Sequence, residues 1–302
     1  MAVAIIGTGL SGLACAQTLA AGGEEIVLFD KSKGYGGRMA SRRQDGVAFD
    51  HGLPSFDPVA AETIPALTAL PAWQEYGRVA APQMTAFPRG IGEGFESRMG
   101  ARVVRIDTGT LDLTDENGTR HRDFSKIVVA IPAPQAHELL GDRRADFGAL
   151  EQATYAPCCT LMLGGVDGGE GVADRIAPET GPIALLIRDD TKPGHPAGVP
   201  CFVAHARRDW SAANVTRDKP EIADDLSIAF AAMTGLDPTT TPYRAGHRWL
   251  YSQPDRVVPA PFLLSSDGRI GACGDWAGAD RTGGDARAAW RSGEALGRAM
   301  LG

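Results

Sequence analysis

The feature that most constrains this chain is a glycine-rich segment near its start, residues 7–12 (Gly-Thr-Gly-Leu-Ser-Gly). The apolar run before it, residues 2–6, predicts a buried strand, and the apolar spacing after it predicts a helix that ends near Ala21. Residues 25–30 predict a second strand. Strand, helix and strand in this order indicate a parallel β–α–β unit with a right-handed crossover.

The spacing of the three glycines has a mechanical explanation. Gly7 permits the tight turn out of the strand, Gly9 lets the backbone approach a pyrophosphate, and Gly12 lets the helix pack closely on the strand. The start of the helix offers unpaired N–H groups to the phosphates. Asp30 ends the second strand, where its carboxylate would accept hydrogen bonds from a ribose diol. These features predict a dinucleotide site but do not distinguish NAD from FAD.

A second glycine pair follows the second strand, in Gly36-Gly37-Arg38. An NAD-dependent dehydrogenase has no need of it, whereas the pyrophosphate and ribityl chain of a longer dinucleotide pass this loop. There the glycines would give access to the backbone, and Arg38 would supply a fixed positive charge. The pair therefore favours FAD, although a plain surface turn would also explain it.

A third motif, Gly274-Asp275, stands near the C-terminus and precedes a helix that is predicted to begin near Asp285-Ala286. Asp275 could hold a ribityl hydroxyl. The helix start would direct its partial positive charge at the N1/C2=O edge of an isoalloxazine, which becomes anionic on reduction. The alternative is an ordinary turn before a helix that closes the domain.

The middle of the chain has a different pattern, with short predicted strands between Gly/Pro/Asp clusters and one amphipathic helix around residues 222–233. The predicted strands are 126–131, 158–163, 183–188, 199–205 and 243–251. The expected fold is α/β: a Rossmann-type, glutathione-reductase-like FAD-binding domain with an inserted α+β substrate domain on a mostly antiparallel sheet. The FAD-binding domain would take residues 1–52, 84–135 and 256–302, and the substrate domain residues 53–83 and 136–255.

Composition excludes several classes of partner. The chain has 30 Lys+Arg against 37 Asp+Glu and a formal charge of −7, which disfavours nucleic acids and anionic membrane surfaces. Its five cysteines have no disulfide or metal-ligand spacing, so no metal is expected. The apolar start lacks a basic region and is interrupted by glycines, unlike a signal peptide, so a cytoplasmic location is expected.

Several motifs together resemble the flavin-containing amine oxidase superfamily, namely the early glycine motif, Gly36-Gly37-Arg38, Phe49-Asp-His-Gly52 and Gly274-Asp275. Less general stretches resemble its bacterial renalase-like branch, at residues 130–135, 155–158, 208–211 and 247–251. The resemblance implies FAD bound without a covalent link. With the arguments above, it predicts these cofactor-binding residues: Gly7, Gly9, Leu10, Ser11, Gly12, Asp30, Lys31, Gly36, Gly37, Arg38, His51, Gly52, Val103 (through its backbone to adenine), Gly274, Asp275, Asp285 and Ala286.

Two positions depart from the pattern of that superfamily. Asp30 stands where the family commonly has Glu, which is one methylene longer. Arg287-Ala288 stands where the family usually has Glu and Gly, so the flavin contacts and the redox tuning there need not follow the family.

The renalase-like branch implies a substrate class: the 2- and 6-dihydro isomers of NAD(P)H, oxidised to NAD(P)+ while O2 takes the electrons and yields H2O2. Hydride transfer from a dihydropyridine to flavin N5 needs no protein base, and none of the five lysines stands beside a strand motif suited to amine oxidation. Lys192 and Lys219 are expected in loops flanked by proline. The alternatives are an amine oxidase or desaturase, and a sensor that binds flavin or NAD without catalysis.

Candidate residues for the substrate pocket come from the inserted domain. Alternation along a strand places His247, Trp249 and Tyr251 on one face and Arg248 on the other. The rings could stack on a nicotinamide, and His247 or Arg248 could meet its carboxamide or phosphates. Tyr155 and Cys158 could line the flavin side. A core face and a solvated face would explain the same alternation equally well.

Overall fold

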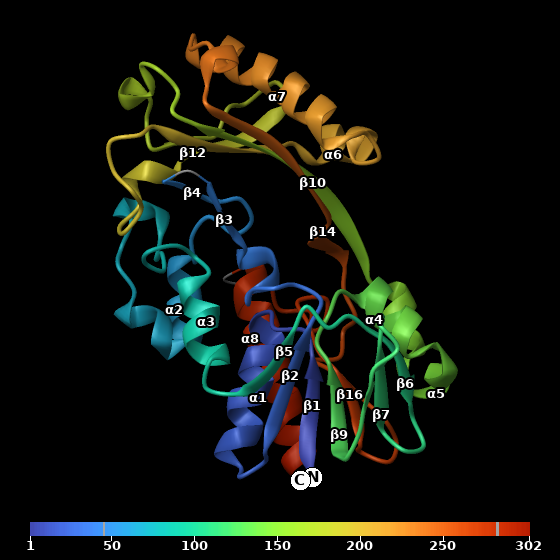
Figure 1. Cartoon of the computed structure of the whole chain (residues 1–302). Helices are drawn as coiled ribbons and strands as arrows, with labels where there is room; N and C mark the ends of the chain where they lie inside the picture. The colour runs from blue at the N-terminus through green and yellow to red at the C-terminus, as the bar shows by residue number, and fades with distance from the viewer. Residues whose placement is uncertain (45, 282–283) are drawn as a thin grey trace.

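A six-stranded sheet forms around the β–α–β unit at the start of the chain, in the order β15-β16-β9-β1-β2-β5 (Figure 1). The computed structural model describes residues 1–44, 46–281 and 284–302. Strands β1, β2, β5, β9 and β16 are parallel, and β15 is antiparallel to β16. The bounds are β1 Ala2–Ile6, β2 Ile26–Asp30, β5 Glu96–Met99, β9 Phe124–Val129, β15 Leu263–Leu264 and β16 Ile270–Ala272.

Helices from both ends of the chain cover one face of this sheet. α1 (Leu10–Ala21) and α8 (Gly284–Leu301) pack closely, because a Cβ at Gly293 of α8 would overlap the backbone of Ser11. The opposite face packs under the fully buried Trp276 and α4 (Ala133–Leu139). Lys126 of β9 donates to the Met300 carbonyl oxygen and to Glu24. Elements from the start of the chain (β1, α1) and from its end (β16, α8) therefore belong to one Rossmann-type layer.

A five-stranded antiparallel sheet, ordered β11-β12-β13-β10-β14, forms the second layer, above the first in Figure 1. Helices α6 (Arg208–Asn214) and α7 (Lys219–Thr234) cover its outer face, where Gly246 lets α7 approach the sheet. Lys219 therefore begins a helix and does not lie in a loop. The strands are β10 Thr154–Gly164, β11 Arg175–Ile176, β12 Ile183–Arg188, β13 Cys201–Ala206 and β14 Tyr243–Arg256.

Two segments that the sequence assigns to the substrate domain pack against the first layer. Residues 53–83, called here the connecting segment, include α2 (Pro58–Thr63) and pack in one apolar cluster with Leu10 of the first layer and Met162 of the second. Leu140, Phe147 and Leu150, predicted in the substrate domain, pack with the core of the Rossmann-type sheet. The structural boundary therefore falls near Ala153, just before β10 begins. α5 (Arg144–Phe147) and the turn after it bury their apolar side chains in the core of the Rossmann-type sheet.

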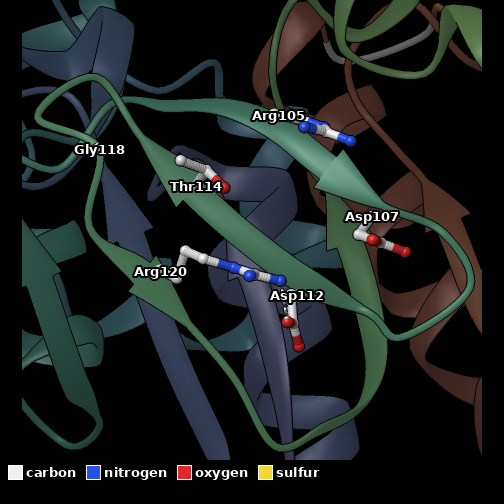
Figure 2. A pocket seen from close by; sticks show the side chains of 6 residues that line it. All are labelled: Arg105, Asp107, Asp112, Thr114, Gly118 and Arg120. Atoms are coloured by element: carbon white, nitrogen blue, oxygen red, sulfur yellow. Dashed lines mark hydrogen bonds and ion pairs between the residues drawn. The ribbon is translucent and has the colours of Figure 1, made fainter.

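Smaller elements complete the fold. The hairpin β3 (Ser41–Gln44) and β4 (Val47–Asp50) lies against the second layer, and α3 (Ala86–Gly92) lies beside α1. A three-stranded sheet contains β6 (Val103–Asp107), β7 (Asp112–Asp115) and β8 (Arg120–His121). A cavity of about 360 Å³ lies on this small sheet. Figure 2 shows the side chains that line it. The cavity includes no residue predicted to bind a cofactor or substrate, and its Arg120 and Asp112 form an ion pair at 2.9 Å.

Candidate functional site between the two layers

The three glycines of the first motif occupy three different environments. Gly7 has a φ of +104°, and a Cβ there would overlap the Ala130 carbonyl. A Cβ at Gly12 would overlap the carbonyl oxygen of Gly7, so this position also requires glycine for packing. No atom lies within 4 Å of a Cβ built on Gly9. Gly9 therefore borders open space, as expected where a ligand approaches the backbone.

That open space lies at the N-terminus of α1, where Leu10 and Ser11 begin the helix. Gly9 is its N-cap, no side chain caps it, and its first turn has no acidic residue. The second glycine pair lies across from it: Gly36 donates its N–H to the Thr8 carbonyl oxygen at 2.9 Å, and Gly37 lies near Gly9. Free backbone N–H groups in a first turn that has no acidic residue form a site for an anion.

Asp30 has protein partners in place of an open carboxylate. One oxygen accepts from the backbone N–H and the hydroxyl of Thr8, at 2.8 and 2.7 Å, and the other accepts from the Ser32 N–H. Its backbone oxygen accepts from Ala101, which brings the chain before Val103 to the same end of the sheet. Lys31 is exposed. Asp30 holds the glycine-rich turn in place and retains lone pairs for a further donor.

Arg38 and Asp275 meet on the other side of this space. An Arg38 nitrogen lies 2.5 Å from Asp275, which is 2% exposed, and the Tyr155 hydroxyl donates to the other oxygen of Asp275 at 3.1 Å. The pKa of Tyr155 is raised mainly by burial and secondly by the negative charge of Asp275, so the phenol stays protonated. Gly274 is covered by the indole of Trp276. The structure thus joins three residues that the sequence predicted separately.

The start of α8 differs from the simple positive helix end that the sequence suggested. Asp285 lies in its first turn and pairs with Arg281, and burial together with nearby Asp275 raises the pKa of Asp285. Ala286 packs on the apolar cluster of the connecting segment. Arg287 donates to the Thr63 hydroxyl of α2 at 2.6 Å, so its guanidinium contacts the connecting segment.

Aromatic side chains of the second layer form a wall, defined here as His51, His247, Trp249, Tyr251 and Tyr155. The His51 ring stacks on Trp249 at 5.2 Å and meets His247 edge-on at 4.8 Å, while Tyr251 meets Tyr155 at 5.6 Å. The Trp249 indole N–H donates to the His51 carbonyl oxygen at 2.9 Å. The predicted sharing of one strand face by His247, Trp249 and Tyr251 agrees with these contacts.

The remaining pocket candidates separate by strand register. Cys158 pairs with Trp249 across β10 and β14, which places both on the wall side of the sheet. Arg248 donates to the carbonyl oxygens of Val215 and Arg217, beneath α6 and α7. Arg248 therefore does not join the wall, and its role as a pocket residue is corrected: it binds the backbone at and just after the C-terminal end of α6, on the helical side of the sheet. A Cβ at Gly52 would overlap the Arg38 carbonyl oxygen and contact Trp249, so Gly52 joins the wall to the loop of Arg38.

The histidines of the wall are neutral. Burial, with a smaller effect from Arg42, lowers the pKa of His51 to about 4, and burial and the nearby His51 lower that of His247 to about 3. Burial also lowers the pKa of the neighbouring His205 to about 4. The Nδ1 atoms of His51 and His247 are buried without a hydrogen-bond partner. Each of these atoms leaves a hydrogen bond for a water or a ligand to supply.

These lowered pKa values predict acid sensitivity. In the unfolded chain a histidine takes up a proton near pH 6.5, but His51 in the fold does so only near about 4. Stability is therefore kept above about pH 6.5 and lost as the pH falls toward about 4, by about 3 kcal/mol for His51 alone. Thermal unfolding across this window measures the loss. A His247→Gln variant should show a shallower pH dependence, and an unchanged slope would contradict the assignment of neutral histidines.

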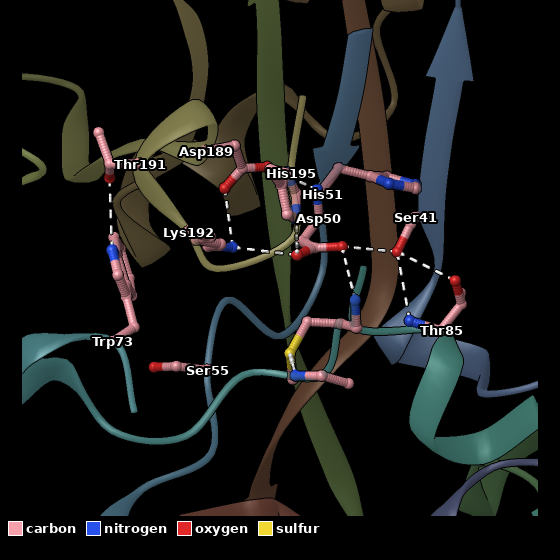
Figure 3. A network of polar contacts seen from close by, with 12 residues as sticks. Ser41, Asp50, His51, Ser55, Trp73, Thr85, Asp189, Thr191, Lys192 and His195 are labelled. Carbon is pink, nitrogen blue, oxygen red and sulfur yellow. Dashed lines mark hydrogen bonds and ion pairs between the residues drawn. The ribbon is translucent and has the colours of Figure 1, made fainter. Parts of the chain in front are cut away.

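One group of buried charges was not foreseen from the sequence. Figure 3 shows four side chains that lie together behind the wall, namely Asp50, Asp189, Lys192 and His195. The Lys192 side chain is fully buried, although the sequence places it in a loop flanked by proline. Asp50, Asp189 and His195 have the spacing of metal ligands, although the sequence indicated none. The Lys192 ammonium lies among them, so it supplies the cation in place of a metal.

Comparison with known proteins agrees with the Rossmann-type half. The family model for the NAD(P)-binding Rossmann-like domain matches residues 5–67. The 4,4'-diapophytoene desaturases of Staphylococcus haemolyticus and Staphylococcus aureus are 44% identical over 52 residues, which is 17% of this chain and 10% of those proteins. The chain thus matches only a tenth of these curated relatives.

Solved structures share the whole fold at low identity. A structure assigned to a protoporphyrinogen oxidase from Exiguobacterium sp. superposes with a TM-score of 0.74 at 12% identity, over 99% of this chain and 98% of that one. A putrescine oxidase gives 0.67 at 12% identity over 99% and 98% of the two chains. A UDP-galactopyranose mutase gives 0.59 at 10% identity over 84% and 82%. No helix among the described residues is long and apolar enough to cross a membrane.

Proposed function

We propose that the chain is an FAD-dependent oxidoreductase. Its cofactor would lie between the glycine-rich turn of residues 7–12, called here the glycine cradle, and the aromatic wall. The residues fit such a ligand: the space beside Gly9 is open, the N-terminus of α1 is uncapped, and Arg38 lies across from it. The α1 N–H groups and Arg38 would hold the pyrophosphate, and Asp275 a ribityl hydroxyl. Asp30 would receive the ribose, and the backbone near Val103 the adenine.

We further propose that the substrate is a 2- or 6-dihydro isomer of NAD(P)H. The reaction would be dihydro-NAD(P) + O2 + H+ → NAD(P)+ + H2O2, in which the substrate loses a hydride and O2 gains two electrons. Bound FAD would supply the hydride acceptor, N5, and the route of electrons to O2. Because the donor becomes aromatic by losing hydride alone, no residue of the chain need remove a proton from it.

The observation that carries this substrate class is the neutral, aromatic character of the wall. Trp249 and Tyr251 offer faces for a flat ring. The partnerless Nδ1 atoms of His51 and His247 belong to neutral imidazoles, which can accept hydrogen bonds from the NH2 of a carboxamide. An expected cytoplasmic location, where pyridine nucleotides are abundant, belongs to the same proposal.

Amine oxidation is the second candidate, suggested by the fold shared with putrescine oxidase. The aromatic wall could face an ammonium group, but a buried ammonium also needs a carboxylate to balance its charge. Asp275, the acidic residue that contacts the wall through Tyr155, is already paired with Arg38. Lys192, which is buried, is bound to Asp50 and Asp189. These contacts favour the dihydropyridine.

The test is anaerobic mixing of the FAD-loaded protein with 6-dihydro-NAD(P), 2-dihydro-NAD(P), ordinary NADH and a panel of amines. The dihydro isomers should bleach the flavin, and air should restore its colour with release of H2O2. A Trp249→Leu variant should reduce the flavin about 10-fold more slowly, since it loses one stacking face. Asp224→Asn, on the helical side, is the matched control. Bleaching by amines and not by the isomers would overturn the substrate proposal.

A further inference from the structure

The cluster behind the wall, defined as Asp50, Asp189, Lys192 and His195, unites two distant parts of the chain. Asp50 ends β4, and the other three belong to the turn between β12 and β13 (Figure 3). The side chains of all four are at most 1% exposed. Trp73, from the connecting segment, lies against the Lys192 ammonium, with its ring centroid 5.4 Å away.

Asp50 is the centre of this cluster. One of its carboxylate oxygens accepts from Lys192 at 3.2 Å and from His195 at 2.9 Å. The other accepts from the Ser41 hydroxyl at 2.6 Å and the Met84 N–H at 3.0 Å. Its own backbone N–H donates to Asp189 at 2.6 Å. With five hydrogen bonds, the end of β4 has little freedom to move.

A gain in folding stability does not by itself explain why the cluster buries charged side chains. Burying charged side chains costs several kcal/mol each, and replacement of buried ion pairs by apolar residues is often neutral or stabilising. Here two carboxylates and one ammonium lie where a few apolar side chains would fill the same volume. A requirement for one defined backbone position would explain why charges are used.

The backbone that this cluster holds continues directly into the wall. The residue after Asp50 is His51, whose carbonyl oxygen accepts from the Trp249 indole at 2.9 Å and from His205 at 3.3 Å. Gly52 follows, and a Cβ built on it would lie 3.2 Å from the Trp249 ring. A shift at the end of β4 would therefore move the His51 ring and release the Trp249 indole.

We propose that the buried cluster is a positioning device for the candidate site: it fixes the Asp50–Gly52 backbone and thereby sets how His51 and Trp249 face the ligand. Asp50, Asp189, Lys192 and His195 are positioning residues in this scheme, because they act through His51 and touch no ligand themselves. That the wall faces a flavin rests on the function proposed above. The hydrogen-bonded path from Asp50 through the His51 backbone to Trp249 does not depend on that function.

The link is tested by NMR of protein labelled with 15N in its tryptophan indoles. The Trp249 signal is identified by its loss in Trp249→Phe. In Asp50→Asn this signal should move, because the carbonyl that it binds is displaced. The matched control Asp224→Asn, which breaks the exposed pair with Arg244 on the other side of the sheet, should leave it in place. A folded Asp50→Asn protein with an unmoved Trp249 signal would overturn the proposal.

A milder variant covers the case in which Asp50→Asn does not fold. His195 contacts the cluster only through Asp50 among its described side-chain hydrogen bonds, so His195→Gln loosens Asp50 while Lys192 keeps both carboxylates. It should shift the same indole signal by a smaller amount, and no shift would contradict the proposal. With FAD bound, the visible circular dichroism of the flavin should change in the same variants. If the chain binds no FAD, the proposed function fails, but the indole signal still decides this inference.

Discussion

A Lys192→Met variant is expected to lose about 3–5 kcal/mol of unfolding free energy. Methionine fills a similar volume, but it leaves Asp50 and Asp189 facing each other in the interior without a cation. Although burial alone would raise it, the pKa of Asp50 is held well below its usual range by Lys192 and His195, and this stabilisation would be lost. Chemical denaturation at neutral pH measures the effect.

Two variants control for the loss of a lysine as such. Lys126→Met breaks the partly exposed pair with Glu24 and should cost about 1 kcal/mol or less. Adding Asp189→Asn to Lys192→Met removes one of the stranded charges and should recover part of the loss. If Lys192→Met is no worse than Lys126→Met, the cluster does not depend on its buried cation.

The second large effect is expected from replacing glycines of the first motif, where Gly12 and Gly9 should affect different properties. Gly12→Ala should destabilise the chain by about 3 kcal/mol, because the new methyl group overlaps the Gly7 carbonyl oxygen and neither backbone can move away cheaply. Gly9→Ala should leave unfolding nearly unchanged, since its methyl group points into open space. Instead it should weaken FAD binding about 10–100-fold, by holding the pyrophosphate away from the α1 N–H groups.

Thermal unfolding without cofactor and titration with FAD measure the two effects independently. Gly141→Ala is the matched control, because Gly141 lies outside the glycine motif, has no positive φ, and a Cβ there would also meet no atom within 4 Å. Equal effects of Gly9→Ala and Gly12→Ala on unfolding would contradict the separate roles assigned to them.

The parts of the fold that sequence predicts well depend on local or periodic signals. The cradle follows from glycine spacing, and the shared face of His247, Trp249 and Tyr251 follows from the two-residue period of a strand. The strands of the inserted sheet are recognisable because turn residues separate them, although β10 and β14 extend beyond the predicted ranges.

The parts that sequence does not predict arise from contacts between distant segments. Lys192 is followed by prolines and glycines, which suggests a loop, yet its ammonium binds Asp50 of β4, 142 positions earlier in the chain. Arg248 has the same strand context as its neighbours, and only α6 and α7 determine what it binds. Asp30 is engaged by Thr8, a partner that motif spacing does not indicate.

The central claim is that both ends of the chain and the inserted sheet enclose one FAD. Its most direct test is a titration of the cofactor-free full-length protein with FAD, monitored by flavin fluorescence and by calorimetry, with NAD as the competing ligand. We expect one FAD per chain, a visible spectrum perturbed by the aromatic wall, and weaker binding in Gly9→Ala. Saturation by NAD with no uptake of FAD would contradict the claim.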